Sequence, residues 1–408
     1  MKKDIFTPAD ILLPDGISLE DWSVIACDQF SSELDYWERV RAKVGNSPST
    51  LNMIIPEAYL SDINIEIEVN KIRDAMEMCM KQGLLREIKD SFILVERTLP
   101  DGRVRRGLVG AVDLDEYDYS GDKAAILASE GTVLDRLPVR VQVRRIVRLE
   151  LPHIIAFIND SEMTVIEPLS YKADKLPLLY DFALMEGGGR ISGRRVCDSD
   201  ADEIMASMRA LHEKSDSLMI MGDGNHSLAA AKVYWDELKQ SYNPAERMNH
   251  PARKALLEIN NVYDPSISFE AIHRVVFNVD PADFVSKFSR AMPAGSDYRL
   301  YWFSRGESGY IEVAADYIGD MLTAMQEFID EYASQTGCHV DYIHGEDTVK
   351  KLAVEERCLG LVLPAMDKNE FFETVTARGA FPKKSFSVGH AKDKRYYLEC
   401  REIMVRSD

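Results

Sequence analysis

The stretch that decides the fold is Leu218-Met219-Ile220-Met221-Gly222-Asp223-Gly224-Asn225-His226-Ser227. Its first four residues form a short apolar run, which predicts a buried strand. Two glycines and four polar residues follow, and residues 228–238, rich in alanine, predict a helix. An amphipathic segment at residues 202–214 precedes the run. The order helix, buried strand, glycine turn, helix is typical of proteins that combine helices with sheets.

Several other segments predict strands joined by tight turns. Two hairpins are expected, one across Pro100-Asp101-Gly102 and one across a Gly-Glu-Ser turn before residue 309. Further strands are predicted at residues 139–149, 272–279 and 359–363, the first with one cationic face. Because hairpins outnumber β-α-β patterns, we expect an α+β fold with mixed sheets, hairpins and flanking helices, and not a doubly wound parallel sheet.

The length of 408 residues suggests two to three domains. No internal repeat or flexible linker stands out, so the domains are expected to pack tightly. We place an N-terminal α+β domain at residues 1–150 and a central α/β domain, which carries the Asp-Gly-Asn-His loop, at residues 151–280. A C-terminal α+β domain covers residues 281–408.

Composition narrows the class of protein. There are 49 basic and 68 acidic residues, a net charge of −19, and such a chain offers no bulk positive field to DNA. No apolar run approaches the roughly 20 residues that cross a bilayer, and no signal-peptide core is present. The six cysteines are too sparse for a disulfide scaffold. We therefore expect a soluble, cytoplasmic protein with neither DNA nor a membrane as partner. The oligomeric state is not indicated.

The glycine loop at residues 222–227 is the first candidate site. It precedes a helix N-terminus, where backbone N–H groups and the helix dipole favour an anion. Glycine at 222 and 224 lets the backbone approach a ligand. His226 titrates near neutral pH and is a candidate general acid or base, and Asp223 could orient it or hold a divalent cation. The alternative is a turn in which Asp223 or Ser227 merely caps the helix.

Three weaker candidates lie elsewhere. Glu130 and Thr132 flank a glycine and could bind a metal or a hydroxyl, but a loop before a strand explains them as well. A basic stretch that includes Lys384 suits phosphate or carboxylate, or is a solvated surface. The pair His273-Arg274 ends an apolar run and could reach a site or be a satisfied core pair.

The motifs together resemble the family called domain of unknown function 1015. The resemblance is carried by residues 222–232, by Glu130-Gly131-Thr132 with Asp135-Arg136-Leu137, by His273-Arg274, and by residues 379–386 and 389–399. Many members have Asp-Gly-His-His-Arg where this chain has Asp-Gly-Asn-His-Ser, which looks like a subgroup variant. Ser129 also replaces a histidine of the family pattern.

The loop is similar in style to the Gly-x-His-Arg box of the ParB/sulfiredoxin superfamily. Members of that superfamily bind nucleotides, and some transfer phosphate to small hydroxy compounds such as free serine. Because Ser227 stands in the place of the arginine, the resemblance implies that a phosphate-binding cation comes from elsewhere, with Arg136, Arg274 and Lys384 as candidates.

Two functions follow. The first is an enzyme that binds a phosphorylated or nucleotide ligand, most concretely a small-molecule kinase; the alternative is a non-catalytic sensor of an anionic metabolite. In the enzyme, His226 would move the proton, while Asp223 and Glu130 would hold Mg²⁺ or the substrate hydroxyl. We expect Glu130, Asp223 and His226 to line one pocket. The expected ligand-binding residues are Gly222, Gly224, Asn225, Ser227, Thr132, Arg136, His273, Arg274 and Lys384.

Overall fold

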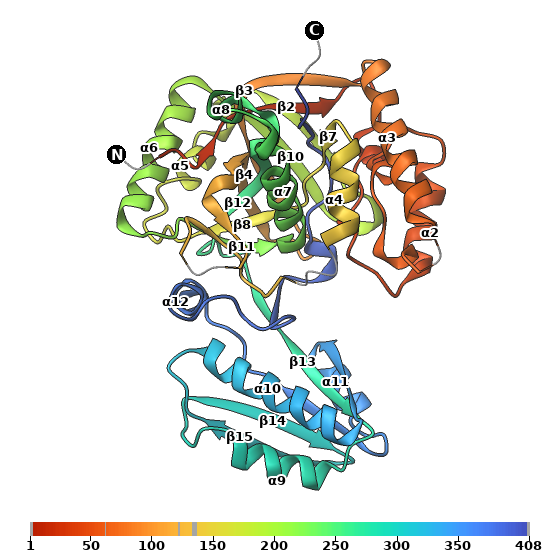
Figure 1. Ribbon diagram of the computed structural model, residues 1–408, viewed down its shortest axis with the longest axis vertical. Coiled ribbons are helices and arrows are strands. Elements are labelled where there is room, and N and C mark those ends of the chain that lie inside the picture. The colour runs from red at the N-terminus through yellow and green to blue at the C-terminus, as the bar shows by residue number, and fades with distance from the viewer. Residues whose placement is uncertain (1–2, 62, 121–122, 133–136, 406–408) are drawn as a thin grey trace. The chain divides into compact units, whose positions relative to one another are not determined.

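The structure is a computed structural model that describes residues 3–61, 63–120, 123–132 and 137–405 (Figure 1). The chain divides into two compact units. Unit 1 comprises Met1–Ala128, Thr132–Ile267 and His390–Asp408, and unit 2 comprises Ser129–Gly131 and Ser268–Gly389. The sequence analysis placed its boundaries near 150 and 280 instead. Since compactness does not show which segments fold on their own, the three-domain division stays a prediction.

Unit 1 is built on a large mixed sheet. The strands follow the order β5-β6-β11-β8-β12-β4-β3-β10-β9, with β1 beside β4 and β2 beside β3. Most neighbours run antiparallel, but β8 runs parallel to β12, and β6 runs parallel to both β5 and β11. A separate pair joins β7 to β19. The strands are β1 (Phe6–Thr7), β2 (Ala9–Pro14), β3 (Leu85–Thr98), β4 (Val104–Asp113), β5 (Tyr117–Asp118), β6 (Ile126–Leu127), β7 (Leu149–Glu150), β8 (Ile155–Ile158), β9 (Leu178–Ala183), β10 (Arg190–Val196), β11 (Met219–Asp223), β12 (Lys254–Asn261) and β19 (Arg401–Glu402).

Helices cover this sheet, and those that bear on the site contact one another: α4 packs against both α3 and α7. The helix α7 is the green one at the centre of Figure 1, beside the yellow α4. The helices of unit 1 are α1 (Leu19–Trp22), α2 (Leu34–Val44), α3 (Ile65–Lys81), α4 (Leu137–Ile146), α5 (Glu167–Ser170), α6 (Asp198–Lys214), α7 (Asn225–Leu238) and α8 (Pro244–Asn249).

The helix α4 corrects one expectation, because residues 139–149 were predicted to be a strand. Residues four apart share a face in a helix as well as in a strand, so a short alternation fits both periods. In the structure, Leu137 and Val141 are the buried pair with this spacing. Pro138 lies in the first turn, where a helix tolerates proline.

Unit 2 contains a second, smaller sheet. Its strands follow the order β15-β14-β17-β13-β16, and β18 pairs with the beginning of β13. The elements of unit 2 are β13 (Phe269–Phe277), α9 (Pro281–Ala291), β14 (Tyr298–Ser304), β15 (Glu307–Val313), α10 (Ile318–Thr336), β16 (His339–His344), α11 (Glu346–Leu352), β17 (Cys358–Val362), α12 (Lys368–Arg378) and β18 (Phe386–Val388).

These two units confirm the α+β class with mixed sheets. The apolar runs at 218–221, 272–279 and 359–363 form β11, most of β13 and β17, which confirms the three buried strands. Both predicted hairpins are present, as β3 with β4 and β14 with β15. Among the described residues, no helix is long and apolar enough to cross a bilayer.

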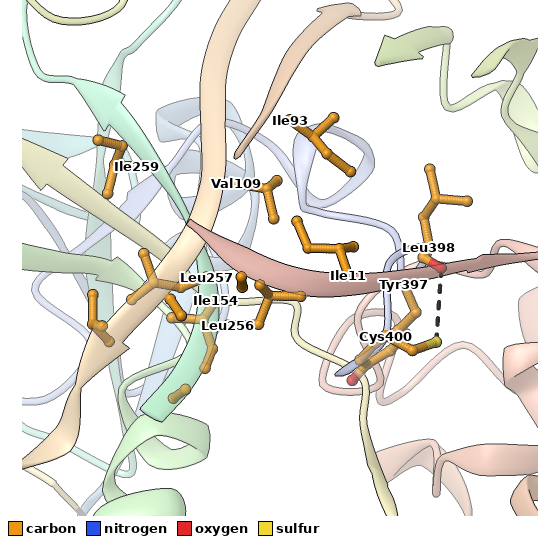
Figure 2. Packing of buried hydrophobic residues seen from close by; sticks show 14 of the residues in the cluster. Ile11, Ile93, Val109, Ile154, Leu256, Leu257, Ile259, Tyr397, Leu398 and Cys400 are labelled. Carbon is orange, nitrogen blue, oxygen red and sulfur yellow. Dashed lines mark hydrogen bonds between the residues drawn. The ribbon is translucent and has the colours of Figure 1, made fainter. Parts of the chain in front are cut away.

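The segment that follows residue 390 returns through the core of unit 1. Tyr397, Leu398 and Cys400 are buried beside Ile11 of β2 and the central strands (Figure 2). The backbone of Cys400 exchanges two hydrogen bonds with Leu12, at N···O distances of 2.8 and 2.9 Å. We call residues 390–400 the return segment. It is held by apolar packing and backbone pairing, although most of it is not a strand.

A buried ion cluster fixes the return segment to the sheet. The guanidinium of Arg395 donates to Glu258 of β12 at 2.8 Å and to Glu399 at 2.6 Å. The other oxygen of Glu399 accepts from the Tyr180 hydroxyl at 2.6 Å. Burial would raise the pKa of Glu258, but Arg395 and Arg105 outweigh it and hold that pKa below its usual value. The charged form of Glu258 therefore depends on these arginines.

Removing the arginine should be costly. Replacing Arg395 by Met leaves two buried carboxylates without their cation, which should lower the free energy of unfolding by about 3–5 kcal/mol. The matched control is Arg145→Ala on α4, which breaks a half-exposed pair with Glu237 and should cost at most about 1 kcal/mol. Urea unfolding followed by circular dichroism measures both. Equal losses in the two variants would contradict a structural role for the Arg395 cluster.

Candidate functional site

The glycine loop forms a tight junction between β11 and α7. The strand ends at Asp223, and Gly224 takes a left-handed conformation with φ of 79°. The helix α7 begins at Asn225, three residues before the start expected from the sequence. A side chain at 224 would be strained at this φ, and its Cβ would lie 3.1 Å from the Cα of Ile154. Glycine is required here, and as the N-cap it supplies no capping side chain to α7.

The other glycine has a packing role. Gly222 is buried within β11, and a Cβ on it would lie 2.5 Å from the ring of Phe157 on the adjacent strand β8. The sequence analysis assigned Gly222 to a ligand-binding loop. In the structure, a glycine at this position lets β8 and β11 pack closely, and its role in ligand binding stays a prediction.

Asp223 is engaged within unit 1. One carboxylate oxygen accepts the N–H of Gly224 at 2.8 Å, and the other lies 3.2 Å from the ammonium of Lys394 in the return segment. Both side chains are largely buried, with exposed fractions of 14% and 9%. Among the described residues, no group of three His, Cys, Asp or Glu side chains could hold a metal ion. Asp223 and Glu130 as Mg²⁺ ligands stay a prediction, and we derive no step from them.

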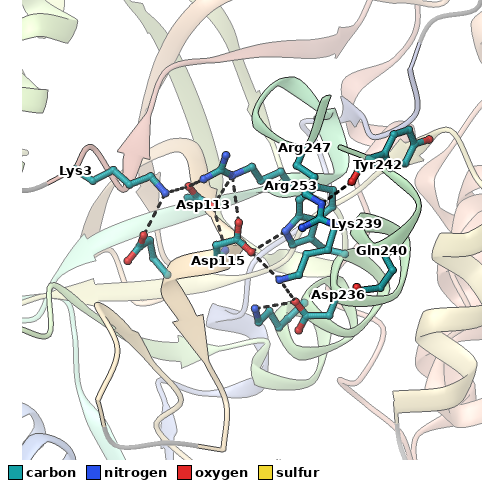
Figure 3. A network of polar contacts seen from close by, with 12 residues as sticks. Lys3, Asp113, Asp115, Asp236, Lys239, Gln240, Tyr242, Arg247 and Arg253 are labelled. Atoms are coloured by element: carbon teal, nitrogen blue, oxygen red, sulfur yellow. Dashed lines mark hydrogen bonds and ion pairs between the residues drawn. The ribbon is translucent and has the colours of Figure 1, made fainter. Parts of the chain in front are cut away.

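The far end of α7 is fixed by a polar network (Figure 3). Asp115 accepts from the indole N–H of Trp235 at 2.9 Å and from Lys239 at 3.0 Å. The neighbouring Asp113 pairs with Arg253 at 2.8 Å. Ion pairs thus anchor the C-terminal end of α7, while the turn at Gly224 sets its N-terminal end. The helix α7, and with it the first turn, is thus fixed at both ends.

A cavity of about 530 Å³ lies beside the first turn of α7. Ser227 and Ala230 of α7 line it together with residues of α3, α4 and the segment between β7 and β8. The lining also includes Arg140, which donates to Glu57 at 2.8 Å, and His153. Every lining residue belongs to unit 1. Its volume is in the range of small-molecule sites.

His153 is the titratable group of this cavity that the sequence analysis missed. Its side chain is 4% exposed, and its ring meets the ring of Tyr397 edge to face at 5.2 Å. Burial lowers the pKa of His153, while Asp28 and Asp223 act in the opposite direction. Burial would raise the pKa of Asp28, but His153, Gln29 and Lys394 outweigh it and lower that pKa. Burial thus favours the neutral imidazole of His153, which lies close enough to Asp28 and Asp223 to interact with both.

Four of the other predicted residues lie in unit 2. Glu130 accepts the N–H of Ser385 at 3.1 Å. Arg274 is fully buried and stacks on the ring of Tyr342 at 4.4 Å, and the Lys384 ammonium lies 5.2 Å from the same ring. Burial lowers the pKa of Arg274 to about 10, against the opposing charges of Tyr342 and Glu130. His273 accepts the N–H of Leu363 at 3.2 Å, which fixes its ring.

The predicted site residues thus fall into two groups. Residues 222–227 belong to unit 1, whereas Glu130, His273, Arg274 and Lys384 belong to unit 2. The Thr132 hydroxyl is buried and has no hydrogen-bond partner in the described part of the chain. Arg136 lies outside the described residues. One pocket shared by Glu130, Asp223 and His226 stays a prediction.

Three contributors escaped the sequence analysis: His153, Arg140 and Asp28. Arg140 was read as part of a cationic strand face, and the helical period of α4 would have placed it beside Val143 and Arg144. No motif surrounds His153 or Asp28. Their pairing depends on contacts between distant segments, and no local pattern reports such contacts.

Fold and site define the class as an α+β protein with a cavity of small-molecule size beside a helix N-terminus. The family model described as "Protein of unknown function (DUF1015)" matches residues 12–403, and the chain belongs to this family. None of the curated proteins compared with the chain matches it. The subgroup and the likeness to the ParB/sulfiredoxin superfamily stay interpretations of the motif.

Similar solved structures include a conserved hypothetical protein from Pyrococcus furiosus, with 9% identity and a TM-score of 0.38 over 71% of this chain and 93% of that chain. Free serine kinase in complex with AMP has 8% identity and a TM-score of 0.36 over 71% and 90%. C-terminally truncated SbnI from Staphylococcus aureus has 11% identity and a TM-score of 0.31 over 69% and 82%. At these TM-scores the likenesses carry no argument about activity.

The lowered pKa of His153 makes a prediction about acid stability. When the pH falls below 6.5, the ordinary pKa of histidine, residue 153 takes up a proton in the unfolded chain. In the folded chain it takes up this proton only at a lower pH. Wild-type protein should therefore lose stability relative to His153→Gln as the pH falls from about 7.5 to 5.5, by at most about 1.4 kcal/mol per pH unit. His250 and His273 titrate in both proteins and cancel in the difference. Unfolding free energies across this range measure it; parallel pH curves would contradict a neutral buried His153.

Proposed function

We propose that the protein is an enzyme that binds a phosphorylated ligand, most concretely a nucleotide, against the first turn of α7 and transfers phosphate to a small hydroxy compound. The observation that carries the proposal is the cavity that opens onto Ser227 in that turn. A helix N-terminus attracts phosphate through its N–H groups and its dipole. The cavity gives the rest of a ligand a place beside that turn.

The local charges support an anion at this position. Lys394 neutralises Asp223, so the strand end next to α7 adds little net negative charge. The α7 dipole is worth ~0.3–1 kcal/mol for an exposed anion and more when the anion is partly buried. Cations from Arg136 and Lys384 remain proposed contributors to phosphate binding.

For the proton transfer, two histidines are candidates. His226, in the first turn of α7, is the candidate from the sequence. His153 has the additional support that it lines the cavity, and that Asp28 and Asp223 would stabilise a proton on its ring. Phosphoryl transfer relies mainly on positioning and charge neutralisation, and a base adds to these.

The alternative is a non-catalytic sensor of an anionic metabolite. It is favoured by one observation, namely that the Asp223 carboxylate already forms an ion pair with Lys394 and accepts the N–H of Gly224. A sensor would use the same cavity and the same helix turn, but would release its ligand unchanged.

Ligand binding can be tested at Ser227, since a side chain at 224 would disturb the fold itself. Ser227→Asp should raise the melting temperature slightly without ligand, because a carboxylate in the first turn suits the helix dipole. It should abolish the shift caused by ADP or ATP with Mg²⁺. The wild-type shift should be roughly 5–10 °C at 100 times the dissociation constant. Ser227→Asn is the matched control, because its side chain has the shape of Asp without the charge, and it should retain the shift. A nucleotide shift that survives Ser227→Asp would place the anion elsewhere.

Turnover separates the two functions. Incubation with ATP, Mg²⁺ and a mixture of small hydroxy compounds should release ADP, and His153→Gln should lower kcat by roughly 10²–10⁴-fold while keeping the nucleotide-induced thermal shift. His226→Gln, measured alongside, should lower it less. A loss of turnover in His226→Gln alone would assign the proton transfer to His226. Nucleotide binding without turnover of any hydroxy compound would favour the sensor.

A further inference from the structure

The wall of the cavity beside α7 is mostly aliphatic. Ile72 and Met76 reach it from α3, Val139 and Val143 from α4, and Ala230 from α7. Met53 completes this side of the lining. Such a wall favours an apolar body, because each buried methylene is worth about 0.8 kcal/mol. It offers little to a sugar or an amino-acid zwitterion.

The charged side chains of the lining are already paired with one another. Arg140 donates to Glu57 at 2.8 Å, and Arg144 donates to Glu150 at 2.7 Å. Glu150 is further bonded to Arg401 at 2.7 Å. A charged ligand group inside the cavity would lose its water without gaining an unpaired counter-ion, which is unfavourable. The part of a ligand that lies against α3 and α4, away from Ser227, is therefore expected to be uncharged.

One polar group of the lining is available for an uncharged ligand. His153 lines the cavity, and only 4% of it is exposed to solvent. In the part of the chain that the structure describes, no group hydrogen-bonds to its ring. A neutral imidazole has one nitrogen that accepts a hydrogen bond. A hydroxyl donor is the smallest uncharged group that satisfies it.

We infer that this cavity binds an uncharged apolar alcohol, with the hydrocarbon body against α3 and α4 and the hydroxyl donating to His153. Binding does not depend on the proposed function. The role of this alcohol as phosphate acceptor does rest on it.

In that reaction the alcohol oxygen forms a bond to the terminal phosphorus of a nucleoside triphosphate. The bond from that phosphorus to the bridging oxygen breaks, and the nucleoside diphosphate leaves with the electron pair. The hydroxyl proton passes to His153. The substrate class is then an apolar alcohol, and not an amino acid or a sugar.

The test uses Met53 and Met76 as reporters, since both line the cavity. The full chain is labelled with ¹³C at the methionine methyl groups, and the two signals are assigned with Met53→Leu and Met76→Leu. Titration with hexan-1-ol should shift these two signals saturably. Sodium hexanoate at the same concentrations should shift neither. The isosteric methyl pentyl ether, which lacks the donor, should bind roughly 2–12-fold more weakly, the equivalent of one neutral hydrogen bond.

A cavity-filling variant gives the second arm. Ala230→Leu places a larger side chain in the cavity and should abolish the hexan-1-ol response. Ala206→Leu, at an exposed position of α6, is the matched control and should retain it. Should Ala230→Leu fail to fold, the comparison of alcohol, ether and carboxylate on wild-type protein decides the question alone.

The outcomes separate this inference from the proposed function. Equal binding of hexanoate and hexan-1-ol, or shifts spread over all methionines, would overturn the alcohol site. Nucleotide binding without a hexan-1-ol response at Met53 and Met76 would overturn it as well, and leave the proposed function standing. A hexan-1-ol response without any nucleotide-induced thermal shift supports the alcohol site and contradicts the proposed function.

Discussion

The buried guanidinium of Arg395 is the contact on which the geometry of unit 1 depends. It holds two carboxylates, Glu258 of β12 and Glu399 of the return segment, and it also donates to the carbonyl oxygen of Pro152. Each group would be costly to bury alone. One arginine therefore joins a central strand, the end of the chain and the backbone next to His153. None of the three can move without breaking a buried hydrogen bond to this guanidinium.

Neighbours of Arg395 are placed by the same constraint. Lys394 reaches Asp223 at the end of β11. On the other side, the Tyr397 hydroxyl accepts the N–H of Cys27, and the backbone of Tyr397 pairs with Val24. Residues near the end of the chain thus complete a site whose other members come from its beginning and middle. This explains why so irregular a segment is so thoroughly buried.

Local periodicity was sufficient to predict most of the elements. The apolar run before Gly222 and the alanine-rich segment after it gave β11 and α7, because strand and helix differ in the spacing of their buried faces. It was insufficient at residues 139–149, where valines two and four apart fit both spacings. This wrong prediction also hid one wall of the cavity. Val139, Arg140 and Val143 line the cavity, and they do so from one side of a helix that was predicted to be a strand.

For the site, the sequence indicated the turn and missed its surroundings. The glycine at 224 is detectable because few other residues adopt its conformation. Gly222 looked equivalent, yet its missing side chain makes room for Phe157. His153 stands between a proline and an isoleucine with no motif around it. Asp28 and Asp223 act on the pKa of His153. The folded sheet and the return segment bring these distant residues close to it.

The ion pair between Lys394 and Asp223 bears on how a chain with a net charge of −19 could hold an anion. Charges beyond roughly 8–10 Å are screened at physiological salt, so the total charge matters less than the few groups beside the ligand. Asp223 directly precedes the Gly224 turn and would repel a phosphate at α7 if it were unpaired. With Lys394 at 3.2 Å, its field at the first turn of α7 is largely cancelled. The helix dipole would then act with little opposition from Asp223, and the return segment, which supplies Lys394, would be a condition for the proposed anion binding as well as for folding.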